Sequence, residues 1–216
     1  MDTLAACQQM VDQQVRTWEV LDRRVLETLA RVPREAFVPA NYRELAFVDA
    51  DIPIGHGEFM LAPNLQGRIL QALALDAADS VLEIGTGSGY LCACLGALAR
   101  TTHSIDIRAD FTALAAANLR AVPAANVKLE TRDAFAGTLL GKFDAIAVTG
   151  SLPVYEARFE QALAVGGRLF VVIGSAPVMD ALLVRRVEVD QWTRESLFET
   201  VIPPLVNAEA APRFVF

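Results

Sequence analysis

Three glycines, Gly85, Gly87 and Gly89, alternate with small polar residues in the stretch VLEIGTGSGY, directly after a short apolar run. Such a pattern predicts a buried strand that turns sharply into a helix, where a nucleotide-like cofactor can lie against bare backbone. The spacing differs from the dinucleotide fingerprint, which needs its third glycine where this chain has Tyr90. An acid, Glu83, lies two residues before the first glycine.

The charge of Glu83 indicates the kind of cofactor. A carboxylate at this turn would repel a pyrophosphate and attract a cation. S-adenosylmethionine (AdoMet) carries an ammonium group and a sulfonium group and no phosphate, so the charge favours AdoMet over NAD. Thr86 and Ser88 are expected to supply turn-compatible side chains and backbone N–H groups at this site. Tyr90 either lies along the cofactor or packs under the following helix.

Two further acids end predicted strands. Asp106 lies about 20 residues beyond the glycine turn, where a ribose-binding acid is expected. Asp133 ends the next strand and could accept a hydrogen bond from an adenine amino group. One acid after a strand is often only a helix cap, but three acids on successive strands indicate a cofactor site. The next residues in the chain, Ile107 and Ala134, complete this candidate site.

Fewer residues in the sequence indicate where the methyl-accepting substrate binds. Thr149 and Ser151 follow the predicted fourth strand, where a substrate would approach, and they either bind it or form an ordinary turn. His56 lies between two glycines and either contacts the substrate or stabilises the turn; we favour the structural role. Residues 49–63 form the natural candidate for a lid. No catalytic residue is certain.

The elements that must position these residues follow from the apolar patterns. Helical spacing at the N-terminus gives way to strands that alternate with helices. A turn of helix is expected at 43–46 and a loop at 49–57. The predicted helices are 4–18, 23–32 (capped by Asp22), 64–75, 90–99, 111–119 and 155–163, and the predicted strands are 80–84, 102–107, 127–131, 143–149, 168–173, 181–189 and 197–202.

The strands also predict the fold class. Continuous apolar runs such as AIAV and RLFVVI are typical of a parallel sheet that helices cover on both faces. The last two predicted strands form an antiparallel pair near one edge. We expect a doubly wound, mostly parallel α/β fold with a seven-stranded sheet of the AdoMet-dependent methyltransferase type and an N-terminal helical segment. Residues 1–75 form the helical and lid segment, and residues 76–216 the AdoMet-binding Rossmann-like part, in one structural domain overall.

Composition excludes several function classes. The 216 residues are 53% hydrophobic, enough for one α/β domain with a real core. The formal charge of −7 argues against broad nucleic-acid binding. No apolar run approaches the ~20 residues needed to cross a bilayer, and the start of the chain lacks a signal-peptide pattern. We expect a cytoplasmic protein, monomeric or homodimeric, without nucleic-acid or membrane partners. The three cysteines and two histidines form no disulfide framework and no metal spacing.

With these motifs assembled, the chain resembles the protein-L-isoaspartate O-methyltransferases. The resemblance covers nearly the whole length and includes RVLETLARVPREAFVP, DADIPIGHG, FDAIAVTGSLP and LAVGGRLFVVIG. It implies an AdoMet-dependent carboxyl O-methyltransferase that acts on isoaspartyl residues of damaged proteins or peptides. Glu83, Gly85, Gly87, Asp106 and Asp133 would match cofactor-binding positions, and the C-terminal LFETVIPPLVNAEA would fold back over the substrate cleft.

One stretch departs from the family pattern. After the glycine turn the family reads Thr-Ile-Ser, one residue and then Pro, with the serine close to the reacting carboxyl, whereas this chain reads FMLAP. Leu61 replaces the serine and Phe59 the threonine, which removes an interaction of roughly 1.5–3 kcal/mol. Ser151 would partly replace the missing hydroxyl. The candidate substrate-binding residues are His56, Gly57, Leu61, Pro63, Thr149 and Ser151.

Three functions therefore remain open from the sequence. The first is isoaspartyl methyl transfer, with activity weakened by the loss of the serine. The second is methyl transfer by the same fold to a different, small or apolar acceptor. The third is AdoMet binding without catalysis, in a sensor or a partner subunit.

Overall fold

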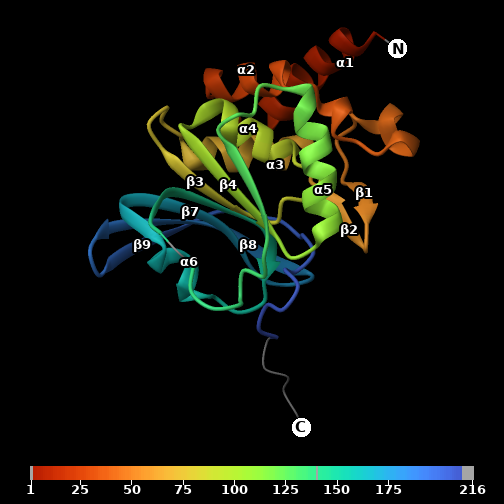
Figure 1. Cartoon of the computed structure of the whole chain (residues 1–216). Coiled ribbons are helices and arrows are strands. Elements are labelled where there is room, and N and C mark those ends of the chain that lie inside the picture. Colours follow the sequence, from red (N-terminus) through yellow and green to blue (C-terminus); the bar gives the residue numbers. More distant parts are fainter. Residues whose placement is uncertain (1, 140, 211–216) are drawn as a thin grey trace.

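The computed structural model describes residues 2–139 and 141–210 (Figure 1). Its centre is a seven-stranded sheet in the order β5-β4-β3-β6-β7-β8-β9. The five strands β3 to β7 pair in parallel, and β8 and β9 extend the sheet antiparallel. The strands are β3 Ser80–Ile84, β4 Thr101–Asp106, β5 Val127–Thr131, β6 Phe143–Leu152, β7 Leu163–Ser175, β8 Val178–Glu188 and β9 Gln191–Glu199. The predicted fold class and the antiparallel edge are confirmed.

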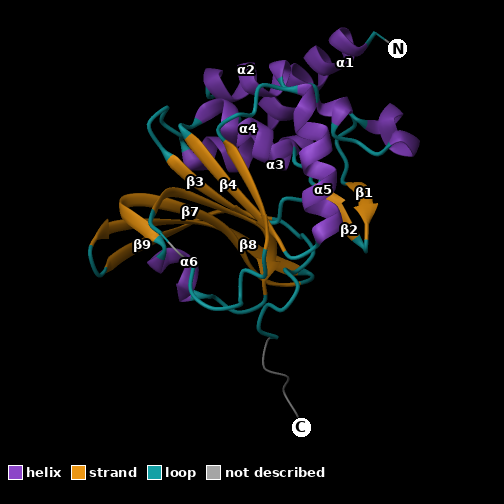
Figure 2. Ribbon diagram, in the orientation of Figure 1, coloured by secondary structure: helices purple, strands orange, loops and turns teal. Residues whose placement is uncertain are grey.

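Helices cover the two faces of the sheet unequally (Figure 2). In the part of the chain that the structure describes, helices α1 to α5 lie on one face and the short helix α6 lies on the other. The helices are α1 Thr3–Gln9, α2 Arg23–Arg31, α3 Pro63–Leu73, α4 Tyr90–Leu98, α5 Ala109–Asn118 and α6 Ala157–Gln161. The predicted helix 155–163 is thus only five residues long, because β7 begins at Leu163, well before the predicted start of that strand.

The N-terminal helical region is continuous but irregular. After α1 the chain continues as a π-helix, Met10–Val15, and a 3₁₀ turn, Arg16–Trp18, where one regular helix was predicted. Asp22 caps α2 as predicted, because its side chain accepts hydrogen bonds from the backbone N–H groups of Arg24 and Val25. Two further 3₁₀ segments, Arg34–Ala36 and Ala40–Leu45, lead towards the predicted lid.

Two predictions about strands and loops were wrong. The predicted loop 49–57 contains a strand, β1 (Ile52–Gly55), which pairs antiparallel with β2 (Glu58–Met60). Positive φ angles at Gly55, His56 and Gly57 make the tight turn between them. The predicted strand 197–202 is shifted: β9 ends at Glu199, and the following residues leave the sheet.

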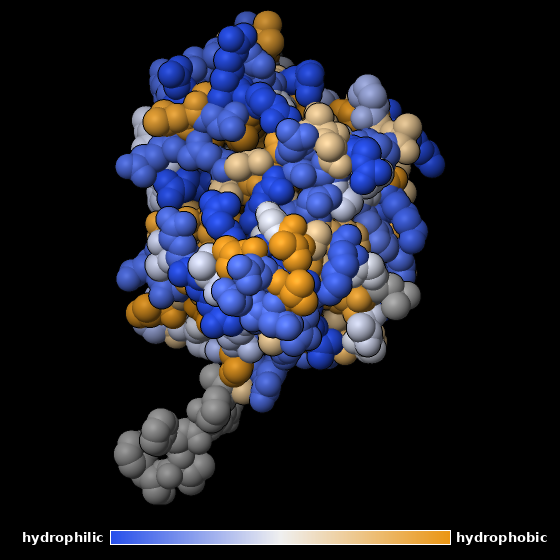
Figure 3. Space-filling model, turned by 90° about the vertical axis from the view of Figure 1, so that its left-hand side faces the viewer, coloured by the Kyte–Doolittle hydropathy of each residue, from blue (hydrophilic) through white to orange (hydrophobic). Residues whose placement is uncertain are grey.

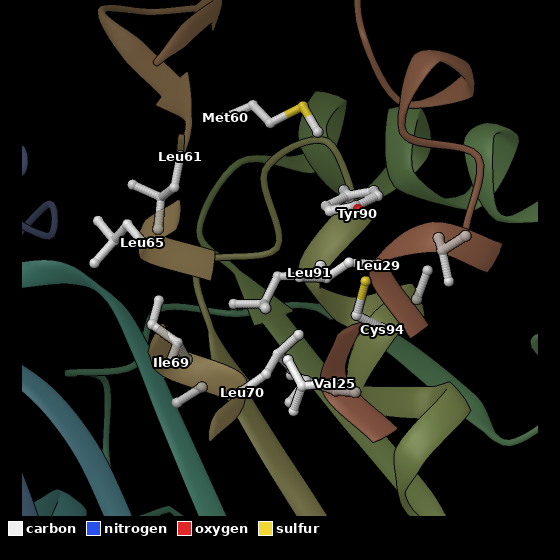
Figure 4. Packing of buried hydrophobic residues seen from close by; sticks show 14 of the residues in the cluster. Val25, Leu29, Met60, Leu61, Leu65, Ile69, Leu70, Tyr90, Leu91 and Cys94 are labelled. Atoms are coloured by element: carbon white, nitrogen blue, oxygen red, sulfur yellow. The ribbon is translucent and has the colours of Figure 1, made fainter. Parts of the chain in front are cut away.

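The helix-covered face holds the larger core cluster, which joins the N-terminal helices to the sheet. In Figure 4, Val25 and Leu29 of α2 lie opposite Leu70 of α3 and Cys94 of α4, with all four side chains buried. The face of the molecule on the left of Figure 1 is mostly hydrophilic, with hydrophobic side chains scattered across it (Figure 3). Among the described helices, none is long and apolar enough to span a bilayer.

Candidate active site

A pocket lies at the carboxyl ends of the parallel strands, where the order of the strands in the sheet reverses between β3 and β6. Ligands of doubly wound sheets bind at this position. The pocket has two adjoining parts. The larger part is lined mainly by the ends of β3, β4 and β5, by the β1–β2 hairpin and by residues 203–206. The smaller part is lined by Phe59, Met60, Leu61, Gln66, Glu83, Gly85, Thr86, Gly87, Ser88, Tyr90, Leu91 and Thr149.

The glycine turn requires its glycines for two reasons. Gly85, Gly87 and Gly89 have φ angles of +96°, +51° and +85°, which side chains strongly disfavour. Close packing is the second reason: a Cβ on Gly89 would lie 2.9 Å from the Cβ of Ala115 on α5, and one on Gly85 would collide with the hydroxyl of Thr149. The turn therefore brings bare backbone to the pocket and allows α4 and α5 to approach each other.

Glu83 is fully buried at the end of β3 and lines the smaller part of the pocket. Its Oε2 accepts a hydrogen bond from the hydroxyl of Ser104, which also bonds to Thr86. Its Oε1 has no hydrogen-bond partner among the described residues. Burial raises the pKa of Glu83 to about 8, although the hydrogen bond from Ser104 favours the charged form. A cation beside Oε1 would satisfy this oxygen and restore its charge.

Asp106 and Asp133 lie together in the larger part of the pocket, as predicted. Asp106 accepts hydrogen bonds from the backbone N–H groups of Gly87 (3.0 Å) and Arg108 (2.9 Å). Asp133 accepts one from the backbone of Phe135 (2.8 Å). These bonds fix the orientation of both carboxylates, and each carboxylate oxygen retains lone pairs for a ligand.

The segment 202–207, which we call the strap, folds back over the same pocket. Its residues Pro203 to Val206 line the larger part. Ser151 and the strap exchange backbone hydrogen bonds, from Ser151 N–H to the carbonyl of Pro203 (2.8 Å) and from Leu205 N–H to the carbonyl of Ser151 (2.9 Å). Asn207 donates to Oδ2 of Asp133 over 2.9 Å. The strap thus links β6 to the acid at the end of β5.

The hydroxyl of Ser151 does not face the pocket. The residue is fully buried, and its Oγ donates to the carbonyl of Ile202 over 3.0 Å. The geometry therefore gives Ser151 a role in holding the strap and does not support the expected replacement of the missing serine. Thr149 does line both parts of the pocket, and its hydroxyl lies 2.9 Å from the carbonyl oxygens of Ile84 and Gly85.

The β1–β2 hairpin forms one side of the pocket through Ile54, Glu58 and Phe59. Its turn is attached to α5 by His56, whose Nε2 lies 2.5 Å from Oδ2 of Asp110. This interaction lowers the pKa of Asp110. The structure places His56 outside the pocket lining, in the structural role that we favoured.

Leu61 lies where the pocket meets the core. It lines both parts of the pocket, yet it is 6% exposed and its side chain points towards Leu65 of α3 (Figure 4). Its carbonyl accepts a hydrogen bond from Arg34, a fully buried guanidinium that also donates to the carbonyl of Ala46. The same guanidinium lies 4.8 Å from the ring centre of Tyr90. Arg34 therefore connects the substrate-side segment to the helix after the glycine turn.

Most predicted cofactor residues meet in the pocket. Those that line it are Glu83, Gly85, Thr86, Gly87, Ser88, Tyr90, Asp106, Ile107, Asp133 and Ala134. Gly89 does not, because it packs against α5. Tyr90 combines both interpretations: it lines the smaller part, but it is buried and packs edge-on against Phe37. Of the predicted substrate residues, Leu61 and Thr149 line the pocket, whereas His56, Gly57, Pro63 and Ser151 do not.

Sequence reasoning missed several lining residues. Arg108, Phe111, Arg132 and Phe135 lie beside the two acids, and Gln66 lies beside Glu83. Arg108, Arg132 and Phe135 lie one or two residues from a strand-ending acid in the sequence, and this position was the signal that could have found them. The position of Gln66 depends on how α3 packs, which no local pattern reports.

Comparisons with known proteins agree with this geometry. The model of the family Protein-L-isoaspartate(D-aspartate) O-methyltransferase (PCMT) matches residues 5–210. A protein-L-isoaspartate O-methyltransferase from Koribacter versatilis is 36% identical over 199 residues, which cover 92% of this chain and 89% of the relative. Another from Roseiflexus sp. is 35% identical over 192 residues, covering 88% of each chain.

Solved structures show the same fold. A crystal structure of a putative protein-L-isoaspartate O-methyltransferase from Plasmodium falciparum, in complex with S-adenosyl-L-homocysteine, superposes with a TM-score of 0.82 at 20% identity. The superposition covers 92% of this chain and 97% of the other. The two chains therefore share the same fold over nearly their whole lengths.

Proposed function

Because this chain belongs to the protein-L-isoaspartate O-methyltransferase family, we propose that it methylates the carboxylate of isoaspartyl residues in damaged proteins, with AdoMet as the donor. The family model and the relatives at 35–36% identity support the reaction. S-adenosyl-L-homocysteine, which the Plasmodium falciparum protein holds, is AdoMet without its methyl group. The comparisons do not favour a different acceptor or a protein without catalysis.

The residues of the pocket fit AdoMet, and Glu83 carries this assignment. A buried carboxylate with an unpartnered oxygen matches the ammonium group of the cofactor. Asp106 would accept hydrogen bonds from the ribose hydroxyls, and Asp133 from the adenine amino group. When bound, the cofactor supplies an electrophilic methyl group on a sulfonium.

The acceptor chemistry explains why the pocket needs no general base. An isoaspartyl carboxylate is already ionised at pH 7, and among the described residues no histidine or cysteine lines the pocket. A carboxylate oxygen bonds to the methyl carbon as the carbon–sulfur bond breaks, which leaves a methyl ester and a neutral thioether. No proton moves, so catalysis rests on in-line positioning and on the exclusion of water.

The chain's own contribution is therefore a rigid and closed pocket. Thr149 is fixed by its contacts with two carbonyl oxygens and holds the glycine turn at the end of β3. The β1–β2 hairpin and the strap close the pocket from two sides. Leu61 places an apolar side chain where the family has a serine, so we propose that the acceptor is held without that hydroxyl.

We further propose that the enzyme acts in the cytoplasm, on proteins and not on nucleic acids or membranes. All three cysteines are unpaired and buried, as in proteins of reducing compartments. The negative formal charge of the chain supports the absence of nucleic-acid binding. Buried residues between Cys7 and Leu75 share a core with the sheet, which supports one structural domain. Cell fractionation and size-exclusion chromatography would test the location and the choice between monomer and homodimer.

The decisive experiment measures tritium transfer from labelled AdoMet to an isoaspartyl peptide and to its normal aspartyl twin. We expect base-labile methyl ester on the first peptide only. Equal labelling of both peptides, or no labelling of either, would refute the proposed function. Calorimetry with AdoMet, run in parallel, separates a protein that binds the cofactor without catalysis from one that does not bind it.

A further inference from the structure

The two parts of the pocket meet at five residues that line both: Phe59, Leu61, Gly85, Gly87 and Thr149. Glu83 marks the ammonium end of the proposed cofactor site, and the two acids at β4 and β5 mark the nucleoside end. The five shared residues therefore border the position where the two ends of the cofactor join, which is the reacting centre. An acceptor must reach this junction.

Two elements contribute apolar side chains to the larger part of the pocket. The hairpin contributes Ile54 and Phe59, and the strap contributes Leu205 and Val206. In the larger part, the charged lining residues lie at or beside the ends of β4 and β5, and Glu58 of the hairpin forms a 4.0 Å ion pair with Arg108. A substrate that lies between hairpin and strap thus contacts hydrocarbon surface.

Two of these apolar side chains remain exposed. Phe59 keeps 39% of its surface exposed and Val206 keeps 38%, although both line a pocket. Large apolar groups exposed at the edge of a pocket are typical of ligand-binding surfaces. They come from different elements, so a side chain lying between them would contact both the hairpin and the strap.

We propose that Phe59 and Val206 form an apolar subsite that selects isoaspartyl sites with a large apolar residue next to the isoaspartyl residue. This inference rests on the proposed function. The occupant is a neighbouring side chain of the same peptide, because Phe59 also borders the junction that the reacting carboxylate must reach. Partial burial of a leucine there is expected to raise kcat/KM about tenfold over serine, which corresponds to about 1.4 kcal/mol.

The test uses three isoaspartyl peptides of otherwise identical sequence. One carries leucine directly before the isoaspartyl residue, one carries leucine directly after it, and one carries serine at both positions. The wild-type enzyme should methylate at least one leucine peptide with about tenfold higher kcat/KM than the serine peptide. Phe59→Ser should reduce that ratio to about two or less, and Phe59→Leu should keep most of it.

A matched control removes an exposed valine elsewhere. Val189 is 64% exposed and lies at the β8–β9 turn, so Val189→Ser should keep the full ratio. Thermal unfolding checks that the variants are folded. Equal kcat/KM for leucine and serine peptides, or a ratio that persists in Phe59→Ser, would overturn the subsite but leave the proposed function intact. A wild-type enzyme that methylates no isoaspartyl peptide would overturn both.

Discussion

Replacing Glu83 by glutamine removes a buried titratable group and keeps the side chain's shape. Burial raises the pKa of Glu83 to about 8, so about 90% of this carboxyl is protonated at pH 7 in the cofactor-free protein. The ammonium group of AdoMet favours the ionised form. Binding at pH 7 should therefore release most of one proton from the wild-type protein and close to none from Glu83→Gln.

The same pKa sets the direction of the pH effects. Below pH 8 the ionised fraction of Glu83 rises about tenfold per pH unit, so AdoMet affinity should rise about ninefold between pH 6 and pH 7. The stability of the cofactor-free protein should change in the opposite direction. Its folded state holds the proton more tightly than the unfolded chain does, so the free energy of unfolding falls as pH rises from about 4.5 to about 8.

Isothermal titration calorimetry of AdoMet in two buffers of different ionisation enthalpy measures the released protons directly. Glu188→Gln, an exposed change on β8, is the matched control and should behave as wild type. Binding without proton release in the wild type would show that Glu83 is already ionised. Equal proton release from Glu83→Gln would show that another group is responsible. Either result would refute this account of the cofactor site.

Three further predictions concern the pocket. Asn207→Ala removes the hydrogen bond to Asp133 and should weaken AdoMet binding by about 1 kcal/mol, seen in stopped-flow measurements as a dissociation rate about fivefold faster. Gly89→Ala places a side chain on a residue with positive φ and close to Ala115. It should lower the free energy of unfolding by at least about 1 kcal/mol in urea titrations, and an unchanged midpoint would contradict this. Leu61→Ser should lower the free energy of unfolding by about 2 kcal/mol in urea titrations, because Leu61 belongs to the core. Higher isoaspartyl activity in this variant would show that the missing hydroxyl limits the reaction.

Local patterns predicted residues that the structure brings together in one pocket. Glu83 and Asp106 lie at the ends of β3 and β4, the glycine turn and Asp133 follow β3 and β5, and parallel strands bring their carboxyl ends to one edge. That relation needs only the order of strands and helices along the chain. The charges of these three acids are therefore enough to indicate the chemistry of the cofactor.

The acceptor half depends on contacts between distant segments. The alternation in 197–202 fits a strand, but Ile202 leaves the sheet because its carbonyl is bonded to Ser151 and two prolines follow that cannot donate to a ladder. The partners of Arg34 lie 12 to 32 residues away, so no local spacing reports them. The turn at His56 was missed as a hairpin because a non-glycine residue with positive φ is uncommon.

The position of the strap in the chain has a consequence for folding during synthesis. Residues 202–207 follow all seven strands in chain order, so a ribosome makes them after the sheet and the glycine turn. A nascent chain that has not yet exposed this segment lacks the lining residues Pro203 to Val206 and the hydrogen bond from Asn207 to Asp133. The pocket is therefore completed only after the strap has left the ribosome and docked on β6.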